Sequence, residues 1–355
     1  DKSRLGSVPL FQGDINDERI IEKICRKHDI TDVVHPDVAA QAVLAARVVG
    51  LDIAGVDVVT PDICQPLGTQ GVVVEVNAGP SLLMHLNPAE GQPRLVGQAI
   101  AEHLISPTET GRIPVVGLMG DGDTTKSAKL IAWLLHLQGL QTGLSSAKGL
   151  FLGQRCLQNQ NGMEWESAQR LLINRSVEAA VFETTARHLL SEGLPYDRCL
   201  VGVITAMPKA EGLQDLYIQS DEQMPNVVRT QMDVVLSNGM AVLNADDADV
   251  VNLAQYCDGE VTYFASSEDN PIIVKHRSEN GRVAFWRKNH LVLAQGDQEI
   301  DALNRQLPAI DKLFKNQFIT CAEVLAASAA AWSLGINTDL IRAGIKSFGQ
   351  SPGSH

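Results

Sequence analysis

The sequence predicts an α/β protein, and three stretches of the chain carry that prediction. The runs Ile53–Thr60 and Gly71–Val76 are rich in β-branched residues and are bounded by Pro, Gly or Gln, which is typical of strands. Residues 113–139 read as a strand, a Gly-containing turn and a helix that ends at Gly139. Residues 321–349 predict two further helices. This mixture of strands and helices indicates packed α/β layers.

Length and composition limit the class of protein. The chain has 355 residues, enough for two or more domains, and 45% hydrophobic with 20% charged residues is ordinary for a globular protein. Its apolar runs are too short to predict a membrane span, and its start shows no signal pattern. Six scattered cysteines without a CxxC motif indicate reduced thiols and a cytoplasmic location. The formal net charge of −13 argues against nucleic acid as the main partner.

Acidic and amide side chains stand inside the two predicted strands. Asp57 lies in the first, and Glu75 and Asn77 share one face of the second because they are two residues apart. If the strands pair as a hairpin, Asp57 lies opposite them, and the three residues offer the hard oxygen ligands that Mg²⁺ prefers. The alternative is three polar residues that face water. The uniformly apolar flanks favour the metal site, because a buried carboxylate without a cation is unfavourable.

The same stretch resembles a known family. The segments AARVVGLDIAGVDVVTPDI and VVVEVNAGP are similar to the C-terminal end of an ATP-grasp domain in the form found in cyanophycin synthetases, and the similarity runs from about Val34 to His103. In ATP-grasp ligases the matching Asp, Glu and Asn hold Mg²⁺ ions that bridge the ATP phosphates. The resemblance therefore implies that Asp57, Glu75 and Asn77 are metal ligands and serve catalysis with ATP.

The surroundings of these strands agree with the resemblance. An Ala-rich helix is predicted from Val38 to Val49, and another from about Val96 to Leu104. Between them the loop AGPSLLMHLNPAEGQPR matches a loop that lies beside the acceptor substrate in these ligases, which makes Ser81 and His85 candidates for substrate contact. The alternative for each is a loop residue that faces water.

The domain boundaries follow from these patterns. Residues 1–33 predict a strand, an Asp-capped helix over about Asp17–Lys27 and a second strand, which resembles part of a nucleotide-sugar epimerase domain; the alternative is a plain packed βαβ unit. Residues 34–105 are assigned to the ATP-grasp part, and the polar stretch 106–112 reads as a linker. Residues 113–349 form a further domain.

That further domain resembles the central domain of Mur ligases, which is also the last large domain of cyanophycin synthetases. The resemblance implies a parallel sheet with helices on both faces and a nucleotide loop that reads G-T-N-G-K-T-T in the family. The aligned residues here run from Met119 to Thr125 and include Gly120, Gly122, Asp123 and Thr124. Asp123 stands where the family has the phosphate-binding Lys, and a neighbouring Asp adds a second negative charge. Both would repel a triphosphate, so the loop is predicted not to bind ATP productively.

Other Mur-like positions are partly lost. Glu183 matches the family's Mg²⁺ ligand, but Ala206 replaces the expected Asn, and the segment after it lacks the expected His. Arg229 stands near the Lys that is carbamylated in Mur ligases, and an Arg keeps its charge. The stretch AVLNADDADV, with Asn244, Asp246 and Asp247, matches the nucleotide-side motif. We favour a structural role for it, in which Asn and Asp cap the following helix, over a surviving adenine site.

The resemblance implies a function. Because the chain stops at SFGQSPGSH where the family continues into a third domain, the similarity is greatest to type 2 cyanophycin synthetases. These use ATP and Mg²⁺ at the ATP-grasp site to join β-aspartyl-arginine dipeptides into cyanophycin through an acyl phosphate. The Mur-like domain would be an inactive scaffold. The resemblance also implies a homo-oligomer, with no membrane partner.

Two alternatives remain open. An ATP-grasp site needs an upstream lobe with nucleotide-clamping Lys residues, and residues 1–33 do not resemble one. The chain would then be a non-catalytic fragment or structural chain with both nucleotide sites incomplete. The other alternative is an active Mur-type ligase in which Asp123 helps to bind metal. It ranks last, because the Lys, the His and the carbamylated Lys are missing together.

Overall fold

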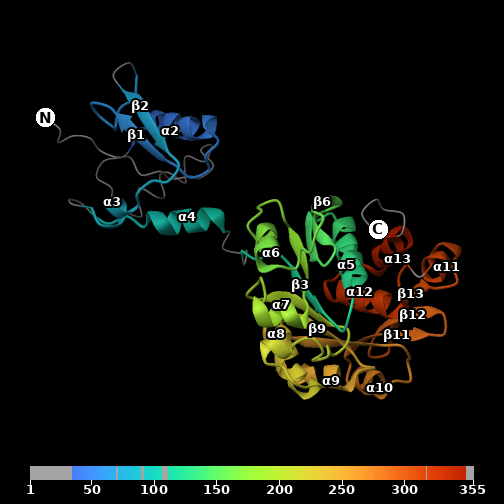
Figure 1. Ribbon diagram of the computed structural model, residues 1–355. Helices are drawn as coiled ribbons and strands as arrows, with labels where there is room; N and C mark the ends of the chain where they lie inside the picture. The colour runs from blue at the N-terminus through green and yellow to red at the C-terminus, as the bar shows by residue number, and fades with distance from the viewer. Residues whose placement is uncertain (1–33, 69–70, 89–91, 106–110, 317, 349–355) are drawn as a thin grey trace. The chain divides into compact units, whose positions relative to one another are not determined.

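The computed structural model describes residues 34–68, 71–88, 92–105, 111–316 and 318–348. The helix predicted over Asp17–Lys27 and most of the predicted linker lie outside these ranges. The chain divides into two compact units, residues 1–112 and residues 113–355, each described by itself (Figure 1). No helix in the described ranges is long and apolar enough to cross a membrane.

The first unit is built around an antiparallel hairpin. Strands β1 (Gly55–Val59) and β2 (Val72–Asn77) pair along their length and cover helix α2 (Pro36–Val48), as the blue part of Figure 1 shows. Short helices α3 (Leu83–Leu86) and α4 (Val96–Leu104) follow. One face of the hairpin packs with α2 into a small core of five buried side chains, which are Val38, Ala42, Val56, Val58 and Leu67. The strands and the two longer helices predicted for this region are confirmed.

The second unit contains one eleven-stranded sheet in the order β13-β12-β11-β10-β9-β8-β3-β7-β4-β5-β6. Its middle, from β11 to β4, is parallel, and antiparallel strands extend it at both edges. The strands are β3 (Val115–Met119), β4 (Thr142–Ser146), β5 (Gly149–Leu152), β6 (Arg155–Gln158), β7 (Ala179–Glu183), β8 (Cys199–Ile204), β9 (Val235–Asn244), β10 (Glu260–Ala265), β11 (Arg282–Arg287), β12 (His290–Gln295) and β13 (Gln298–Asn304).

Helices cover both faces of this sheet, so the predicted α/β class is confirmed (Figure 1). One face carries α5 (Thr125–Leu137), α11 (Pro308–Lys315), α12 (Cys321–Ser333) and α13 (Thr338–Phe348). The other carries α6 (Trp165–Leu172), α7 (Ala186–Ser191), α8 (Met224–Asp233), α9 (Ala248–Val251) and α10 (Pro271–Ser278), with 3-10 turns at 214–216, 221–223 and 252–256.

Alternation along the strands creates two separate cores. On β3, Val116 and Leu118 pack with α5 and α12, whereas Val115 and Met119 pack in the core on the opposite face. All five residues of β3 and of β7 are buried. Near-continuous apolar runs of this kind are expected for parallel strands that are covered on both sides.

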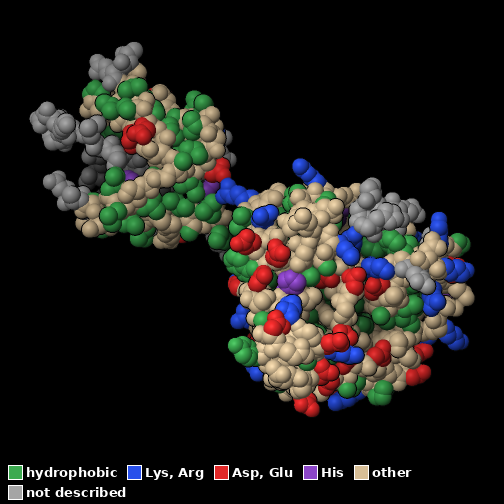
Figure 2. Space-filling view, viewed as in Figure 1, with side chains coloured by type: hydrophobic (Ala, Val, Ile, Leu, Met, Phe, Trp, Pro, Cys, Tyr) green, Lys and Arg blue, Asp and Glu red, His purple; other side chains and the backbone are tan. Residues whose placement is uncertain are grey.

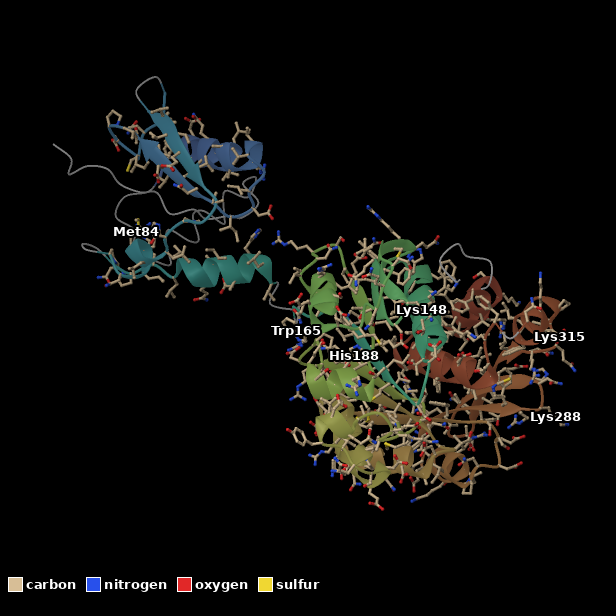
Figure 3. The ribbon with its side chains drawn as sticks, in the orientation of Figure 1. Met84, Lys148, Trp165, His188, Lys288 and Lys315 are labelled. Carbon is tan, nitrogen blue, oxygen red and sulfur yellow. The ribbon has the colours of Figure 1, made fainter. Side chains whose placement is uncertain are left out.

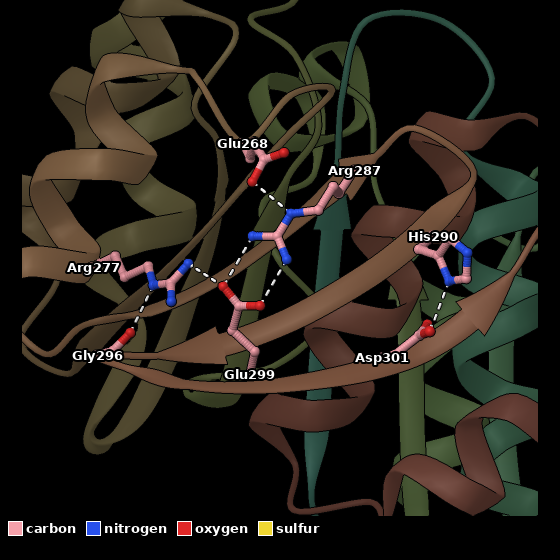
Figure 4. Close-up of polar contacts among 7 residues, drawn as sticks. All are labelled: Glu268, Arg277, Arg287, His290, Gly296, Glu299 and Asp301. Carbon is pink, nitrogen blue, oxygen red and sulfur yellow. Dashed lines mark hydrogen bonds and ion pairs between the residues drawn. The ribbon is translucent and has the colours of Figure 1, made fainter.

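An ion network links α10, the loop after β10 and the antiparallel edge (Figure 4). The Arg287 guanidinium contacts Glu268 at 2.6 Å and Glu299 at 2.7 Å, and Arg277 contacts Glu299 at 2.6 Å. The carboxyl pKa of Glu299 falls to about 2, because Arg287 and Arg277 donate hydrogen bonds to the charged form. The network lies beside the β11–β12 hairpin, which has Lys288 at its turn in the left-handed region (φ 55°).

Candidate nucleotide and metal sites

The outer face of the hairpin carries the three predicted metal ligands. Asp57 lies directly opposite Glu75 in the β1–β2 register, and Gly55 lies opposite Asn77. Val56 and Val58 point into the core and Asp57 points away from it, which places Asp57 on the opposite face. The structure therefore brings two carboxylates face to face.

A β-bulge shapes this face. The register shifts after Asp57, so that Val58 pairs with Val73 and one extra residue, Val74, is inserted in β2. Both Val74 and Glu75 are exposed as a result. Strict alternation along β2 would have placed these two neighbours on opposite faces, and the sequence gives no sign of the bulge.

The face is open to solvent in the described chain. Asp57 and Glu75 are exposed and Asn77 is half-buried, and the neighbouring Val59 and Val72 are 42% and 56% exposed. Apolar side chains cover much of the visible face of this unit (Figure 2). The expectation that the carboxylates are buried is therefore wrong. Both carboxylates are in contact with water, so no bound cation is needed to offset a cost of burial.

The donor set nevertheless matches a magnesium site in kind. Mg²⁺ is usually held through one or two carboxylates together with substrate phosphates, and Asp57 and Glu75 with the amide oxygen of Asn77 supply that chemistry. In the described ranges no group of three or more His, Cys, Asp and Glu side chains is placed to hold a metal ion. Any ion on the hairpin would thus depend on the amide or on a phosphate for further ligands.

The two candidate substrate contacts differ in their surroundings. His85 is half-buried on α3 and lines a cavity of about 60 Å³ with Pro80 and His103, whereas Ser81 is exposed in the preceding loop. Burial, and secondarily the nearby Arg94 charge, lower the pKa of His85, which keeps its ring neutral at pH 7. Figure 3 marks the adjoining Met84 on the same short helix.

The loop between β3 and α5 has the geometry of a strand–turn–helix nucleotide site. Gly120 has no room for a side chain, since an added Cβ would lie 1.9 Å from the Thr205 hydroxyl. Gly122 adopts a φ of +81°, which favours glycine. The two glycines thus shape the turn that delivers Asp123 and Thr124 to the start of α5.

Asp123 uses the donor that a phosphate would need. Its carboxylate accepts a hydrogen bond of 2.9 Å from the backbone N–H of Thr125, the first residue of α5. Burial alone would raise the pKa of Asp123, but the hydrogen bonds from Thr125 and the charges of Lys148 and Lys126 bring the pKa below its usual value. A permanent negative charge therefore lies at the helix N-terminus, where phosphates otherwise bind.

Glu183 is enclosed beneath the same loop. Its side chain is 3% exposed, and its carboxylate accepts hydrogen bonds from the hydroxyls of Thr124 (2.9 Å) and Thr125 (3.0 Å) and from the N–H of Ala147 (2.9 Å). A buried carboxylate needs such donors. Glu183 thus ties the loop, α5 and the β4–β5 turn together through hydrogen bonds within the chain.

Lys148 is a charged neighbour that the motif comparison did not identify. It stands in the turn between β4 and β5, next to Ala147, and Figure 3 marks it together with His188 of α7. Its positive charge acts on Asp123 and on the buried Lys129 of α5. No sequence motif indicates this position, because the β4–β5 turn lies close to the Gly120–Thr125 loop only as a result of the strand order in the sheet.

The Asn244 and Asp246 positions are held by backbone contacts. The Asn244 amide donates to the carbonyl of Thr205 (2.8 Å), and Asp246 accepts from the N–H of Ser266 (2.7 Å). Asp247, rather than either of these, caps α9 through its carboxylate. The prediction that an Asp of this motif caps the following helix is confirmed for Asp247, whereas Asn244 does not cap α9.

Arg229 is engaged on the surface of α8. It pairs with Asp233 at 3.0 Å and lies 4.3 Å from the ring centre of Tyr256. The charge of Arg229 is therefore paired within α8, with a carboxylate one helical turn away.

Comparison with known proteins identifies relatives for most of the chain, although no protein-family model matches it. It is 36% identical over 330 residues to the cyanophycin synthetase of Geminocystis herdmanii, covering 92% of this chain and 37% of that protein. It is 34% identical over 322 residues to the cyanophycin synthetase of Synechocystis sp., covering 90% and 36%.

Solved structures give weaker similarities. MurF from Acinetobacter baumannii has a TM-score of 0.43 and 12% identity, over 68% of this chain and 46% of that one. A UDP-N-acetylmuramoyl-L-alanyl-D-glutamate–2,6-diaminopimelate ligase has a TM-score of 0.48 and 13% identity, over 71% and 50%.

The chain spans a little over a third of the length of the curated relatives it matches, 37% in the case of the Geminocystis protein. The similarity includes nine-tenths of this chain, so it extends over both of its units. The chain is therefore related to a segment of the cyanophycin synthetases.

Proposed function

We propose that this chain acts as an ATP-dependent amide ligase of the cyanophycin synthetase type, most similar to type 2, with the chemistry at the hairpin face of the first unit. The observation that carries the proposal is the β1–β2 register, which sets Asp57 opposite Glu75 with Asn77 further along the same strand. Similarity to cyanophycin synthetases over 92% of the chain supports the substrate class.

The reaction has two steps. The γ-phosphoryl group of ATP passes to an oxygen of the carboxylate at the end of the growing polymer, and ADP leaves. The amine of a β-aspartyl-arginine dipeptide then attacks the acyl carbon, phosphate leaves, and the nitrogen loses a proton. The product is a new amide bond.

The chain's own residues would hold the reactants. Asp57 and Glu75 would bind Mg²⁺ through their carboxylates, and Asn77 through its amide oxygen. A bound Mg²⁺ ion would supply charge neutralisation at the ATP phosphates. Ser81 and His85 are the proposed contacts to the acceptor, and a neutral His85 can donate or accept a hydrogen bond there.

The second unit serves as a scaffold in this proposal. The Asp123 carboxylate lies on a helix N-terminal N–H that a triphosphate would need, and the Glu183 carboxylate is taken by Thr124, Thr125 and Ala147. These contacts disfavour an active Mur-type ligase. In the scaffold role, the loop keeps its shape through hydrogen bonds within the chain.

A non-catalytic role is the second candidate, and the exposure of the hairpin face favours it. Val59, Val72 and Val74 lie uncovered beside Asp57 and Glu75 in the described chain. An active site that excludes water would need this face to be covered.

Phosphate release from ATP tests the proposal. The assay contains Mg²⁺, β-aspartyl-arginine and a cyanophycin primer, and compares the unchanged chain with Asp57→Ala and Glu75→Gln. We expect turnover that each variant reduces by at least about 100-fold, because a lost metal ligand weakens charge stabilisation at the phosphates. The matched control is Glu102→Gln, which removes an exposed carboxylate from α4 of the same unit and should leave turnover unchanged.

Two results would contradict the ligase assignment. One is a folded chain without turnover, which would establish the non-catalytic role. The other is turnover that Asp57→Ala leaves intact and Asp123→Ala abolishes, which would move the chemistry to the second unit. The proposal also includes a cytoplasmic homo-oligomer, which sedimentation and cell fractionation would test.

A further inference from the structure

A ligand-sized groove lies at the amino ends of the parallel strands of the second unit. It has a volume of about 560 Å³ and is lined by residues of β8, β9, β11 and β13 and by the turn between α12 and α13. The Gly120–Thr125 loop and Glu183 lie at the carboxyl ends of the same sheet. Within the second unit, the groove therefore lies at the opposite end of the sheet from the Gly120–Thr125 loop, and its volume is typical of small-molecule sites.

A cation without a protein acceptor lines this groove. The side chain of Arg282, the first residue of β11, forms no hydrogen bond or ion pair with another residue in the described ranges, and its buried Nε has no acceptor. Its guanidinium stacks over the ring of Trp332 at 5.2 Å from the ring centre. Stacking fixes the plane of the guanidinium but leaves its N–H donors unused.

The rest of the lining is neutral, with polar groups beside the cation. The amides of Asn238 and Asn337 and the hydroxyl of Thr338 line the groove, and none of its lining residues is Asp or Glu. In a chain with a net charge of −13, a concave surface with one arginine and no acid is an unusual local charge balance.

Two helix ends meet at the groove. The positive N-terminus of α13 begins there, with Thr338 as its first residue. The last carbonyls of α12 are partly occupied, since Trp332 accepts from the N–H of Gly335 (3.0 Å) and Ala331 from that of Ile336 (3.0 Å). Backbone N–H groups of the following turn thus satisfy these carbonyls at the negative C-terminal end of α12.

The floor of the groove is closely packed backbone. An added Cβ on Gly239 of β9 would lie 2.5 Å from the carbonyl oxygen of Leu200, and one on Gly259 would lie 2.4 Å from that of Gly239. Larger side chains at these two positions would therefore not fit without a shift of the backbone.

We propose that this groove binds the carboxylate group of a small molecule, with Arg282 as the anchoring cation. A planar carboxylate matches the guanidinium fork in two parallel hydrogen bonds. The amide and hydroxyl groups of Asn238, Asn337 and Thr338 suit a polar body such as an amide, and Leu200 and Ile300 offer it apolar contact. The site is independent of the proposed ligase reaction.

Ligand-observed NMR titration of the full chain tests this site with three probes. Hippurate carries a carboxylate on an aromatic amide, its primary amide is the neutral match, and phenyl phosphate presents a phosphoryl group instead. We expect saturable binding of hippurate, and binding of the neutral amide at least about tenfold weaker, because a charge-assisted hydrogen bond is lost.

Variants locate the binding. Arg282→Gln should weaken hippurate binding at least about tenfold. Asn238→Asp, an exposed position on the rim, should weaken it through charge repulsion without disturbing the core. The matched control is Arg305→Gln, which removes an arginine that also stacks on an aromatic ring, Phe314, outside the groove. Hippurate binding should survive this change, and Asp57→Ala as well.

Three results would overturn the proposal. They are hippurate binding that persists in Arg282→Gln and Asn238→Asp, equal binding of hippurate and its neutral amide, and no saturable binding of hippurate at concentrations up to about 10 mM, a range that includes millimolar affinities. Tighter binding of phenyl phosphate than of hippurate would overturn the carboxylate assignment.

Discussion

The Asp123 carboxylate stands at the position that the resemblance to Mur ligases aligns with a phosphate-binding lysine. In this chain Asp123 accepts the N–H of Thr125, the first residue of α5. Lys148 and Lys126 lower its pKa. In the structure, the role of Asp123 is therefore to hold the turn at the start of α5.

Replacing Asp123 by Ala tests that role. The variant loses the acceptor at the start of α5, so we expect the free energy of unfolding to fall by about 0.5–2 kcal/mol, the range for lost capping residues. ATP turnover at the proposed hairpin site should not change. Chemical denaturation and phosphate release measure the two quantities.

The control for this prediction is Asp121→Ala on the same loop. The Asp121 side chain is exposed, so its removal should change stability by no more than about 0.5 kcal/mol. Equal destabilisation by the two variants would show that Asp123 contributes only its charge.

At the level of elements, the antiparallel edge of the sheet depends on charge. Glu299 of β13 joins Arg287 of β11 to Arg277 of α10, and the pKa of Glu299 falls to about 2 from a usual value near 4.5. A lowered pKa means that the ionised form is stabilised by folding. This contribution is complete above about pH 4.5 and disappears as the pH falls toward 2.

The variant Glu299→Gln measures this contribution. Partly exposed pairs contribute up to about 1 kcal/mol each, so we expect the melting temperature near pH 7 to fall by about 2–4 °C. The difference from the unchanged chain should shrink as the pH falls from 4.5 toward 2. A difference that stays constant over that pH range would exclude ionisation of Glu299 as its cause.

The sequence was most informative about individual helices and strands. The β-branched runs located β1 and β2, and the condition that they form a hairpin predicted Asp57 opposite Glu75. The bulge at Val74 was not predictable, because no glycine or other turn residue marks it. The surroundings of Glu183 were equally hidden, since its donors stand 36 to 59 residues away in the chain.

For the molecule as a whole, the strand order could not be read from periodicity. Strand β3 lies between β8 and β7, although β4 follows it in the chain, and only the resemblance to Mur ligases implied a parallel sheet with helices on both faces. The order of the strands depends on which face of the sheet each connecting helix covers. The result in the second unit is two cores separated by one sheet.

Separate cores predict additive effects of mutation. Leu134 on α5 and Met232 on α8 are fully buried on opposite faces. We expect Leu134→Ala and Met232→Ala each to lower the free energy of unfolding by about 2–5 kcal/mol, and the double variant to show the sum within about 0.5 kcal/mol. Urea denaturation of the four proteins measures this.

A pair within one core provides the comparison. Leu130 and Leu134 are one helical turn apart on α5 and share a core, so their double variant should depart from the sum. Strong coupling between Leu134 and Met232 would contradict the separation of the two cores by the sheet.

The self-contained hydrogen bonding around Glu183 has a consequence for how this chain can change over generations. The donors and acceptors around this loop already have partners within the chain. Asp123 accepts a hydrogen bond from the backbone at the start of α5, and the hydroxyls of Thr124 and Thr125 donate to Glu183. The hydrogen bonds that shape this end of the sheet are thus complete within the chain, so the loss of the glycine turn or of the buried acid would lower its stability. Selection for a folded chain alone is then enough to preserve both features.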